Sequence, residues 1–412
     1  MGVAPPAHYR LFPLLAALAA LLFASAGLGL GVSQATASRH LGLAKARSLG
    51  KGDGCSRRAL RAHGRRANAH QRRRLARRRR ICRRRLPKAS RGAEQPIYWG
   101  ATIGDQITGT QAPWDMNAVS RFEELGGKSL SLVNFFAPFA NCSTSPCSFY
   151  RFPTSAIEAI RKHGAIPVFS WSSQSIPSSK EEPDFQLSDV IAGTYDSYIR
   201  EWAEDARDWG HPFFLRFNWE MNGNWFPWAE GVNGNQAGEY VAAWRHVHDI
   251  FTAVGATNAT WVWCPNIDPG GKFTSLSSLY PGDEYVDWTG LDGYNWGPKK
   301  GGWTGFDHLY RSTYATIAES VAPSKPLMIG EMGSTENGGS KAAWIGEALA
   351  AIPSEYPQVR GVLWFDKFDD GMDWPIETSS ESADAFASGI QNPAYRGNSY
   401  EDLSASPIPP PS

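Results

Sequence analysis

Two glutamates stand at the ends of short apolar segments, and their positions make them candidates for acid–base chemistry. Glu220 ends the segment PFFLRFNWE at residues 212–220, and Glu331 follows the apolar start of PLMIGEMGS at residues 326–334. Apolar surroundings raise the pKa of a carboxyl group because they disfavour its charged form. Glu220 lies among aromatic residues in RFNWEMNGNWFPW. We therefore expect Phe217, Trp219 and Trp225 to keep it protonated near neutral pH.

Two carboxyl groups that face each other are what cleavage of a glycosidic bond requires. One must donate a proton to the leaving oxygen, and the other must act as a nucleophile or as a base that activates water. Aromatic rings suit the same chemistry because the C–H faces of sugars are apolar. The chain contains 17 tryptophans. We expect those at predicted strand ends to line a sugar-binding cleft, namely Trp171, Trp225, Trp228, Trp263, Trp296 and Trp364.

Eight apolar segments alternate with amphipathic ones and predict the elements that position these residues. The predicted strands are residues 96–104, 128–136, 165–173, 212–220, 259–266, 288–296, 326–334 and 359–367. Continuous apolar strands that alternate with helices are typical of parallel sheets covered on both faces. No Gly-rich phosphate-binding loop follows the first strand, which disfavours a doubly wound nucleotide-binding sheet. The sequence therefore predicts a (β/α)8 barrel, whose active site would lie at the C-terminal ends of the strands.

The motif RFNWEMNGNWFPW, followed 111 positions later by GEMGS, resembles glycoside hydrolase family 26. This retaining barrel family contains β-mannanases, β-1,3-1,4-glucanases and β-1,3-xylanases, and the resemblance covers residues 95–400. It implies that Glu220 is the acid/base and Glu331 the nucleophile. It further implies that Tyr294, in GLDGYNWG, donates a hydrogen bond to the nucleophile. Trp225 resembles an aromatic residue of the catalytic subsite, and Trp364 resembles a sugar platform.

One position departs from the family pattern, because Trp219 stands where the family usually has a histidine before the acid/base. Family mannanases use that histidine near the catalytic subsite, so a glucan or another β-linked polymer also becomes a candidate. The prediction is a secreted endo-1,4-β-mannanase, with β-1,3-1,4-glucanase and β-1,3-xylanase as alternatives. Arg216 and Asn222 are candidates for holding the carboxylates or sugar hydroxyls, although hydrogen bonding within the barrel would explain them equally well.

Other classes of function receive less support from the sequence. The nine histidines do not fall at predicted strand ends, where a metal-dependent hydrolase would place its ligands. No G-x-S-x-G motif indicates a serine nucleophile. The sequence thus predicts neither a metal site nor a cofactor. A barrel that only binds polysaccharide is the alternative from another class, and the presence of both glutamates disfavours it.

The two ends of the chain differ from the predicted barrel at residues 93–403. Residues 1–37 contain a long apolar segment and predict a signal peptide, with an uncleaved membrane anchor as the alternative. Residues 38–92 carry 21 Lys and Arg against one acid and predict a disordered tail. This tail could attach to an anionic cell-wall polymer or membrane surface, and a solvated linker or a removed pro-segment is an equally good interpretation. Export disfavours nucleic acid as its partner. Residues 404–412 are Pro-rich and show no core-forming pattern.

We expect the protein to be an extracellular monomer that acts on a polysaccharide substrate. Export into an oxidising compartment would allow Cys142 and Cys147, which bracket CSTSPC, to form a local disulfide. Cys264 lies in an apolar segment and is expected to be a buried small hydrophobic residue rather than a nucleophile.

Overall fold

The computed structural model describes residues 94–397, 400–403 and 406–412. The predicted signal peptide at residues 1–37 and the predicted Arg-rich tail at residues 38–92 lie outside these described residues. Within the described part of the chain, no helix combines the length and the apolar character needed to cross a membrane.

Eight parallel strands of the described chain close into a barrel. They are β1 (Ile97–Ile103), β2 (Leu132–Asn141), β4 (Ile166–Ile176), β5 (Phe213–Phe217), β6 (Ala259–Trp263), β7 (Trp288–Asn295), β8 (Leu327–Ser334) and β9 (Val359–Asp366). Neighbouring strands pair in this order, and the pairing of β1 with β2 closes the ring. Each strand falls on one of the eight predicted apolar segments, so the predicted (β/α)8 barrel is confirmed. Two-residue strands extend the sheet, β3 (Ser148–Phe149) beside β2 and β10 (Tyr395–Arg396) beside β1.

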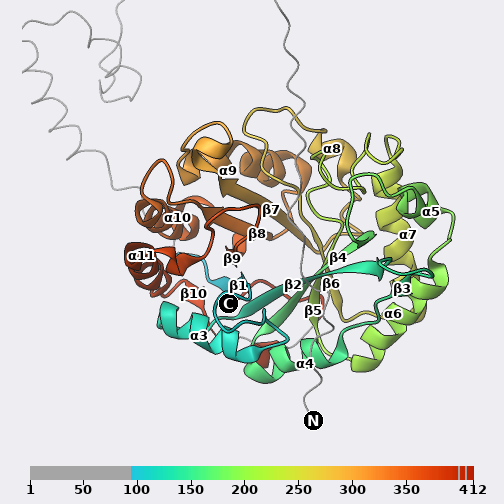
Figure 1. Ribbon diagram of the computed structural model, residues 1–412, viewed down its shortest axis with the longest axis horizontal. Helices are drawn as coiled ribbons and strands as arrows, with labels where there is room; N and C mark the ends of the chain where they lie inside the picture. Colours follow the sequence, from blue (N-terminus) through green and yellow to red (C-terminus); the bar gives the residue numbers. More distant parts are fainter. Residues whose placement is uncertain (1–93, 398–399, 404–405) are drawn as a thin grey trace, which may run out of the picture. The chain divides into compact units, whose positions relative to one another are not determined.

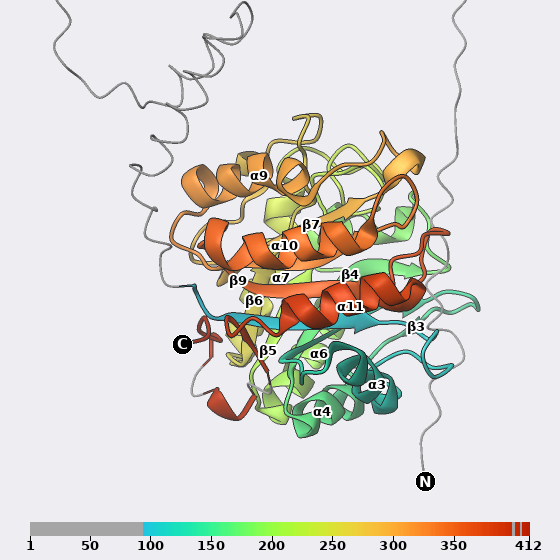
Figure 2. The same ribbon diagram turned by 90° about the vertical axis from the view of Figure 1, so that its left-hand side faces the viewer.

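A helix follows each barrel strand, and these helices surround the strands (Figure 1). In chain order they are α3 (Met116–Gly126), α4 (Thr154–His163), α6 (Asp196–Trp209), α7 (Glu239–Val254), α8 (Leu276–Leu279), α9 (Phe306–Thr316), α10 (Lys341–Glu355) and α11 (Ser380–Ile390). The short helix α5 (Leu187–Ile191) precedes α6, and five residues, Ile317–Val321, continue α9 as a π-helix. Helices α10 and α11 run side by side along the outside of the barrel (Figure 2).

Several strand boundaries differ from the prediction, and the start of β2 and the end of β5 have clear physical causes. β2 begins at Leu132 rather than at residue 128, because Gly127 adopts a left-handed conformation (φ 62°) that ends α3 and the chain must turn before it enters the sheet. β5 ends at Phe217, three residues before Glu220. Asn218 and Glu220 both have positive φ values of 43° and 54°, which a strand cannot accommodate. The bend at the end of β5 therefore lies within the most distinctive motif of the sequence.

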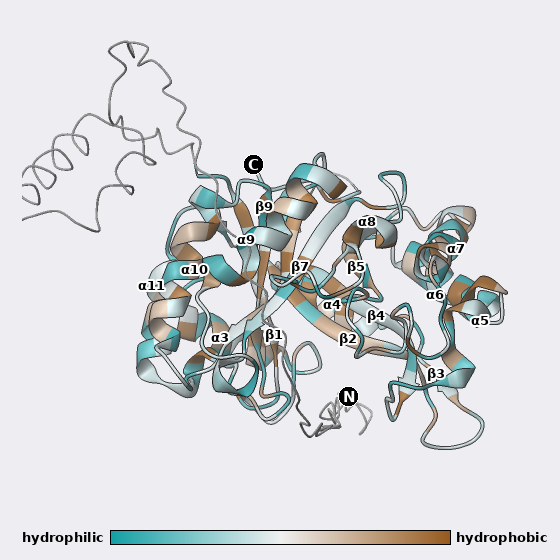
Figure 3. Cartoon of the chain, turned by 90° about the horizontal axis from the view of Figure 1, so that it is seen from above, coloured by the Kyte–Doolittle hydropathy of each residue, from teal (hydrophilic) through white to brown (hydrophobic). Residues whose placement is uncertain are grey.

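The hydrophobic core has an aromatic layer between the strands and the helices. Trp171 of β4 stacks on Trp202 of α6 with ring centroids 4.4 Å apart, and Trp364 of β9 lies near Phe386 of α11 at 5.8 Å. Figure 3 shows hydrophobic residues along strands such as β1 and hydrophilic residues on outward surfaces such as those of α10. Successive strand residues point to opposite faces. The residues that alternate with these tryptophans along β4 and β9 therefore point into the barrel, where the site lies.

The Pro-rich segment at the C-terminal end contradicts the expectation that it would lack core contacts. Ile408 is buried, its backbone N–H donates to Thr260 Oγ1 at 2.8 Å, and its carbonyl accepts from Trp288 Nε1 at 2.8 Å. Arg360 donates to the Pro411 carbonyl. Thr260, Trp288 and Arg360 lie at or near the N-terminal ends of β6, β7 and β9, so this segment covers the end of the barrel opposite Glu331. Its prolines have no amide hydrogen to satisfy, and the carbonyls that remain accept bonds from side chains.

The cysteines of the described chain behave as the sequence indicated. Cys142 and Cys147 form a disulfide that closes the short loop between β2 and β3. Cys264 is free and fully buried just beyond β6, which confirms its expected role as a small buried residue.

Candidate active site

Glu220 and Glu331 meet at the C-terminal end of the barrel. Glu220 follows β5 and Glu331 lies in β8, and both are more than nine-tenths buried. One carboxylate oxygen each of Glu220, Glu331 and Asp292 lies within 4.8 Å of the other two. The structure therefore brings the two sequence-predicted acids together and adds Asp292 of β7, which the sequence analysis had not selected.

The bend after β5 aims Glu220 at the barrel axis. The side chain of Asn218 accepts from the Ser173 backbone at 2.8 Å and donates to Ser173 Oγ at 2.8 Å, which ties the bend to the end of β4. The Glu220 amide donates to the Cys264 carbonyl at 2.7 Å. Positive φ at a residue with a side chain costs on the order of 1 kcal/mol or more and persists where surrounding contacts impose it. These hydrogen bonds supply that constraint.

Two side-chain donors hold the Glu220 carboxyl group. Asn266 Nδ2 donates to Oε1 at 2.5 Å, and Trp225 Nε1 donates to Oε2 at 2.6 Å. Burial and the nearby charge of Glu331 raise the pKa of Glu220 to about 7, while the two donors and Arg216 act in the opposite direction. Glu220 is thus suited to donate a proton near neutral pH.

Two of the three aromatic residues that were expected to raise the pKa of Glu220, Phe217 and Trp225, do not do so. The indole N–H of Trp225 stabilises the charged carboxylate and so lowers the pKa of Glu220. Phe217 packs outside the barrel, near Phe139 and Trp244. Burial of the whole carboxyl group and repulsion by Glu331 raise the pKa instead.

Two other residues hold Glu331 in place. Arg216 Nη2 donates to Glu331 Oε1 at 2.5 Å, and the Tyr294 hydroxyl donates to Oε2. Burial and the charge of Glu331 raise the pKa of Tyr294 well above its usual value, so the phenol keeps its proton and remains a donor. The role that the resemblance implied for Tyr294 matches this geometry, and Arg216 holds a carboxylate as the sequence analysis considered.

Arg216 belongs to a layer of polar side chains that crosses the barrel interior. Its Nη2 also donates to Asp292 Oδ2 at 2.5 Å, and its Nη1 donates to Ser170 Oγ at 3.1 Å. Ser170 donates to Asn134 Oδ1 at 2.8 Å, and Asn134 donates to Thr102 Oγ1 at 2.8 Å. Hydrogen bonds thus run from Thr102 of β1 to Glu331 of β8. Buried polar groups connected in this way fix one geometry, because each unpaired member would be costly.

A metal ion does not fit this arrangement. Glu220, Asp292 and Glu331 supply three carboxylates close enough to share a cation. The guanidinium of Arg216, however, is fully buried and lies 2.5 Å from both Asp292 and Glu331. It supplies the positive charge that these acids require. The chemistry of the site is that of an acid, a nucleophile and their hydrogen-bond donors.

Of the six tryptophans predicted to line a sugar-binding cleft, two lie at the site and four are buried in the core. Trp225 and Trp296 are half-buried at the site, where Trp296 lies 6.0 Å from Tyr294 between ring centroids. Trp171, Trp228 and Trp364 are buried to at least 99% and cannot contact a sugar. Trp171 and Trp364 occupy the face of their strands that points toward the helices, which a strand-end position alone did not reveal. Trp263, expected in the same group, is fully buried too.

Trp228 is a buried residue that holds the aromatic residues next to Glu220 in place. Its Nε1 donates to the Trp219 carbonyl at 2.7 Å, and its ring stacks on Phe226 with centroids 4.3 Å apart. Trp219 lies over the Arg216 guanidinium at 5.1 Å and beside Phe136 at 5.1 Å. The residue that departs from the family pattern therefore forms part of the aromatic wall of the site and covers the buried cation.

Several residues of the site were not identified from the sequence. Asn266 ends the fifth predicted strand, at residues 259–266, and this position was a signal that could have selected it. Asp292 lies inside the quoted motif GLDGYNWG but within a strand, where its side chain direction was unknown. Asn222 forms hydrogen bonds with the backbone of Asn266 in both directions at 2.8 Å, so its side chain positions the residue that donates to Glu220. Phe136 and Trp374 complete the aromatic surroundings, with Trp374 lying 4.8 Å from Tyr294.

One face of Trp296 is covered in the structure. The Lys300 ammonium lies 3.5 Å from the centre of its ring, a distance typical of a cation–π contact. The adjacent Lys299 donates to the Asp370 carbonyl, which links the loop after β7 to the loop after β9. A sugar could therefore stack on this face of Trp296 only after Lys300 moves.

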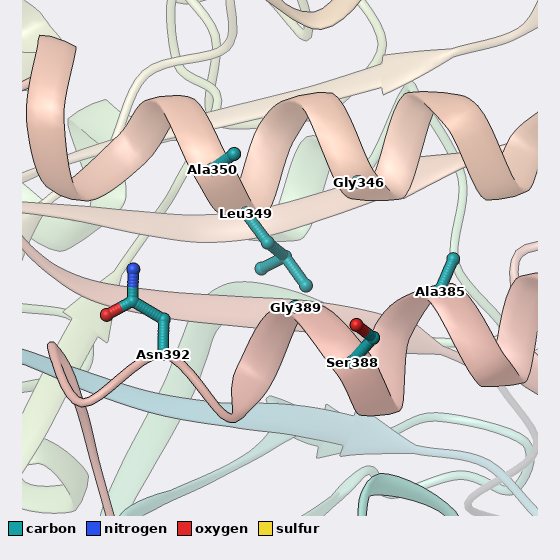
Figure 4. A pocket seen from close by; sticks show the side chains of 7 residues that line it. All are labelled: Gly346, Leu349, Ala350, Ala385, Ser388, Gly389 and Asn392. Carbon is teal, nitrogen blue, oxygen red and sulfur yellow. The ribbon is translucent and has the colours of Figure 1, made fainter.

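A groove of about 380 Å³ lies elsewhere on the barrel, between α10 and α11 (Figure 4). Its lining consists of Gly346, Leu349, Ala350, Ala385, Ser388, Gly389 and Asn392. It contains no titratable side chain and shares no residue with the carboxyl site, so it does not contribute to the chemistry described here.

Comparisons with known proteins agree with this geometry. Residues 141–337 match the family model described as glycosyl hydrolase family 26. The Endoglucanase H of Acetivibrio thermocellus is 36% identical over 298 residues, which cover 71% of this chain and 30% of that protein. A mannan endo-1,4-β-mannosidase of Bacillus subtilis is 27% identical over 238 residues, or 55% of this chain and 60% of that protein. The chain thus spans about a third of the length of the first relative.

Solved structures show the same fold at low sequence identity. A Cellulomonas fimi endo-β-1,4-mannanase superimposes with a TM-score of 0.56 and 20% identity over 74% of this chain and 72% of that one. The Bacillus subtilis mannanase BCman gives 0.52 and 20% over 78% and 92%. The barrel and its paired glutamates thus define a glycoside hydrolase scaffold. The chain belongs to glycosyl hydrolase family 26.

Proposed function

We propose that the protein is a retaining endo-β-glycoside hydrolase. Glu331 attacks the anomeric carbon while Glu220 transfers its proton to the departing oxygen, so the glycosidic bond breaks and a glycosyl ester forms. Glu220, now ionised, then removes a proton from a water molecule that attacks the ester. The hydrolysed sugar leaves with its original anomeric configuration, and both glutamates return to their starting states.

One observation carries this proposal, the short separation of the two carboxyl groups. Oxygens of Glu220 and Glu331 lie within 4.8 Å. Retaining enzymes hold their carboxyl groups about 5–5.5 Å apart, whereas inverting enzymes need about 6.5–9.5 Å to accommodate a water molecule. The surrounding donors support the same division of roles. Arg216 and Tyr294 stabilise negative charge on Glu331, while burial favours the protonated form of Glu220.

The primary candidate substrate is β-1,4-mannan, because several family relatives are named mannan endo-1,4-β-mannosidase. A β-glucan is the second candidate, and two observations favour it. The relative matched over the largest share of this chain among those described above is named Endoglucanase H. Trp219 also presents an aromatic ring where mannanases of the family present a histidine. β-1,3-Xylan remains a third candidate, since relatives over 26% of the chain are named β-1,3-xylanase.

Release of reducing sugar from a panel of polysaccharides tests the proposal. The panel contains galactomannan, glucomannan, mixed-linkage β-glucan and β-1,3-xylan, and the matched controls are Glu220→Ala and Glu331→Ala. We expect hydrolysis of one polymer that both substitutions abolish, with a rapid fall in viscosity that marks cleavage within chains. Tight binding to a polymer without any release would refute hydrolysis and favour a polysaccharide-binding barrel.

We further propose that the chain is exported and acts outside the cell as a monomer. The disulfide between Cys142 and Cys147 supports this, because such bonds persist mainly in oxidising compartments. The Arg-rich segment at residues 38–92 would then attach the enzyme to an anionic cell-wall or membrane surface. Cell fractionation of the full chain and of a variant without residues 38–92 tests the attachment. Equal release of both into the medium would contradict it.

A further inference from the structure

Lys367 is nearly buried at the active-site end of the barrel and has no hydrogen-bond or ion-pair partner within the described part of the chain. It follows β9 directly, and only 8% of the residue is exposed. Among the residues that the structure describes, none lies within hydrogen-bond or ion-pair distance of its ammonium group. Burial lowers the pKa of Lys367, and the more distant charges of Asp369, Asp105 and Glu331 only partly oppose this. Because the ammonium nitrogen still touches solvent, a bound ligand can reach it and replace water as its hydrogen-bond acceptor.

The position of Lys367 places it on one side of the scissile bond. Its Cβ and Cγ pack so closely against Gly104 that a Cβ there would lie 2.8 Å from Cγ, so the stem of Lys367 passes the end of β1. β9 lies between β8 and β1 in the barrel, while Glu220 follows β5. Because Glu220 protonates the departing oxygen, the leaving group lies on the β5 side. Lys367 therefore stands on the opposite side, with the nucleophile and the glycone sugars.

The residue after Lys367 is also suited to carbohydrate. Phe368 is 54% exposed, the highest exposure among the large hydrophobic residues of the described chain. Sugar sites combine aromatic surface with a few placed hydrogen-bond donors. The loop after β9 supplies both in adjacent residues.

We propose that Lys367 is a substrate-binding residue that donates hydrogen bonds to hydroxyl groups of a neutral sugar on the glycone side of the scissile bond. This inference rests on the proposed hydrolase function. The neighbouring acids Asp105 and Asp369 favour neutral hydroxyls, since they would repel the carboxylate of an acidic sugar. No acceptor among residues 94–397, 400–403 and 406–412 bonds the three ammonium hydrogens, so they are available to such hydroxyls.

The substitution Lys367→Met tests this proposal, because methionine keeps much of the side-chain volume and removes the donors. Lys325→Met is the matched control, since Lys325 donates to the Asp283 carbonyl at 2.7 Å at the other end of the barrel. kcat and KM are measured on the polymer that the wild-type protein hydrolyses, together with the midpoint of thermal unfolding. We expect kcat/KM to fall about 10- to 100-fold for Lys367→Met, as for loss of a charged hydrogen bond. The unfolding midpoint should stay unchanged or rise.

A purely structural role for Lys367 predicts the reverse pattern. Lys367→Met would then lower the unfolding midpoint and leave kcat/KM, assayed well below that midpoint, within twofold of the wild-type value. That result would overturn the proposal. Lys367→Arg, which keeps a charged donor, should recover part of the lost kcat/KM, and no recovery would also count against it.

Failure of the proposed function gives a different result. If the wild-type protein hydrolyses no polymer of the panel, the hydrolase proposal fails before any variant is compared. Calorimetric binding of manno- and cello-oligosaccharides to wild type and Lys367→Met then tests the lysine alone. Equal affinities would refute its role in binding, and at least tenfold weaker binding by the variant would support it.

Discussion

Removal of the Asn266 side chain should move the pH dependence of hydrolysis in a defined direction. Asn266 Nδ2 donates to Glu220 Oε1 at 2.5 Å and so favours the charged carboxylate. Asn266→Ala should therefore raise the pKa of Glu220 above its value of about 7. Since Glu220 must be protonated to act, the alkaline limb of kcat/KM should shift to higher pH.

The size of the shift follows from the strength of the lost hydrogen bond. A bond to a charged group contributes about 1.5–3 kcal/mol, and a pKa change of one unit corresponds to about 1.4 kcal/mol. The donor also stabilises the neutral carboxyl group, which reduces the difference between the two protonation states. We therefore use the lower end of this energy range, about 1.5 kcal/mol, and expect a shift of about one pH unit. At pH 8 the protonated fraction would rise from about one tenth to about one half, a roughly fivefold gain relative to each enzyme's own plateau.

The assay is the initial rate of reducing-sugar release below KM, measured across the pH range in which both proteins stay folded. The Asn266 backbone should keep its place in the variant, because Asn222 holds both its N–H and its carbonyl. Trp296→Phe serves as the control. This ring lies beside Tyr294 at the same site, whereas the donors to the Glu220 carboxyl group are Asn266 and Trp225, so its alkaline limb should stay in place. An unmoved limb, or one displaced to lower pH, would refute the assigned cause of the raised pKa.

Three further substitutions test other parts of the structure. In Arg216→Lys the new ammonium group cannot bond Ser170, Asp292 and Glu331 as one planar guanidinium does. We expect kcat to fall at least about 100-fold while the circular dichroism spectrum shows that the fold is retained. Lys341→Met removes three hydrogen bonds, of 2.5, 2.6 and 2.9 Å, to the loop that carries Trp374. It should cost roughly 2–4 kcal/mol in urea unfolding and raise KM, and an unchanged stability would contradict the role of this buried amine. Deletion of residues 406–412 exposes the site of Ile408 and leaves Trp288 Nε1 unpaired. We expect a loss of roughly 3–5 kcal/mol with kcat unaltered, and an altered kcat would show that the two ends of the barrel are coupled.

The sequence was sufficient to predict the barrel and the two glutamates, because both depend on local patterns. Apolar strands separated by helices specify the repeating unit, and Glu220 and Glu331 lie at the strand ends that this repeat brings together. The direction of a single side chain is a different kind of information. Trp171 and Trp225 are both aromatic residues near strand ends, yet one packs against α6 and the other bonds Glu220.

Residues that act through contacts distant in the sequence were also missed. Asp292 becomes part of the site only because Arg216, 76 positions earlier, reaches it across the barrel. Ile408 packs into the core although its segment has no periodic pattern, because the ends of β6 and β7 happen to offer it a donor and an acceptor. Such partners are set by the closed barrel and not by neighbouring residues.

The polar layer from Thr102 to Glu331 has a consequence for protein design. Transplanting Glu220 and Glu331 with their own strands, β5 and β8, onto another barrel would leave Arg216 without Ser170 of β4 and Asp292 of β7. A design that transfers this site must therefore include the polar side chains of six strands, β1, β2, β4, β5, β7 and β8. Designs that alter the surroundings of Glu331 should therefore also consider Thr102, which hydrogen bonds connect to Glu331 through three intervening side chains.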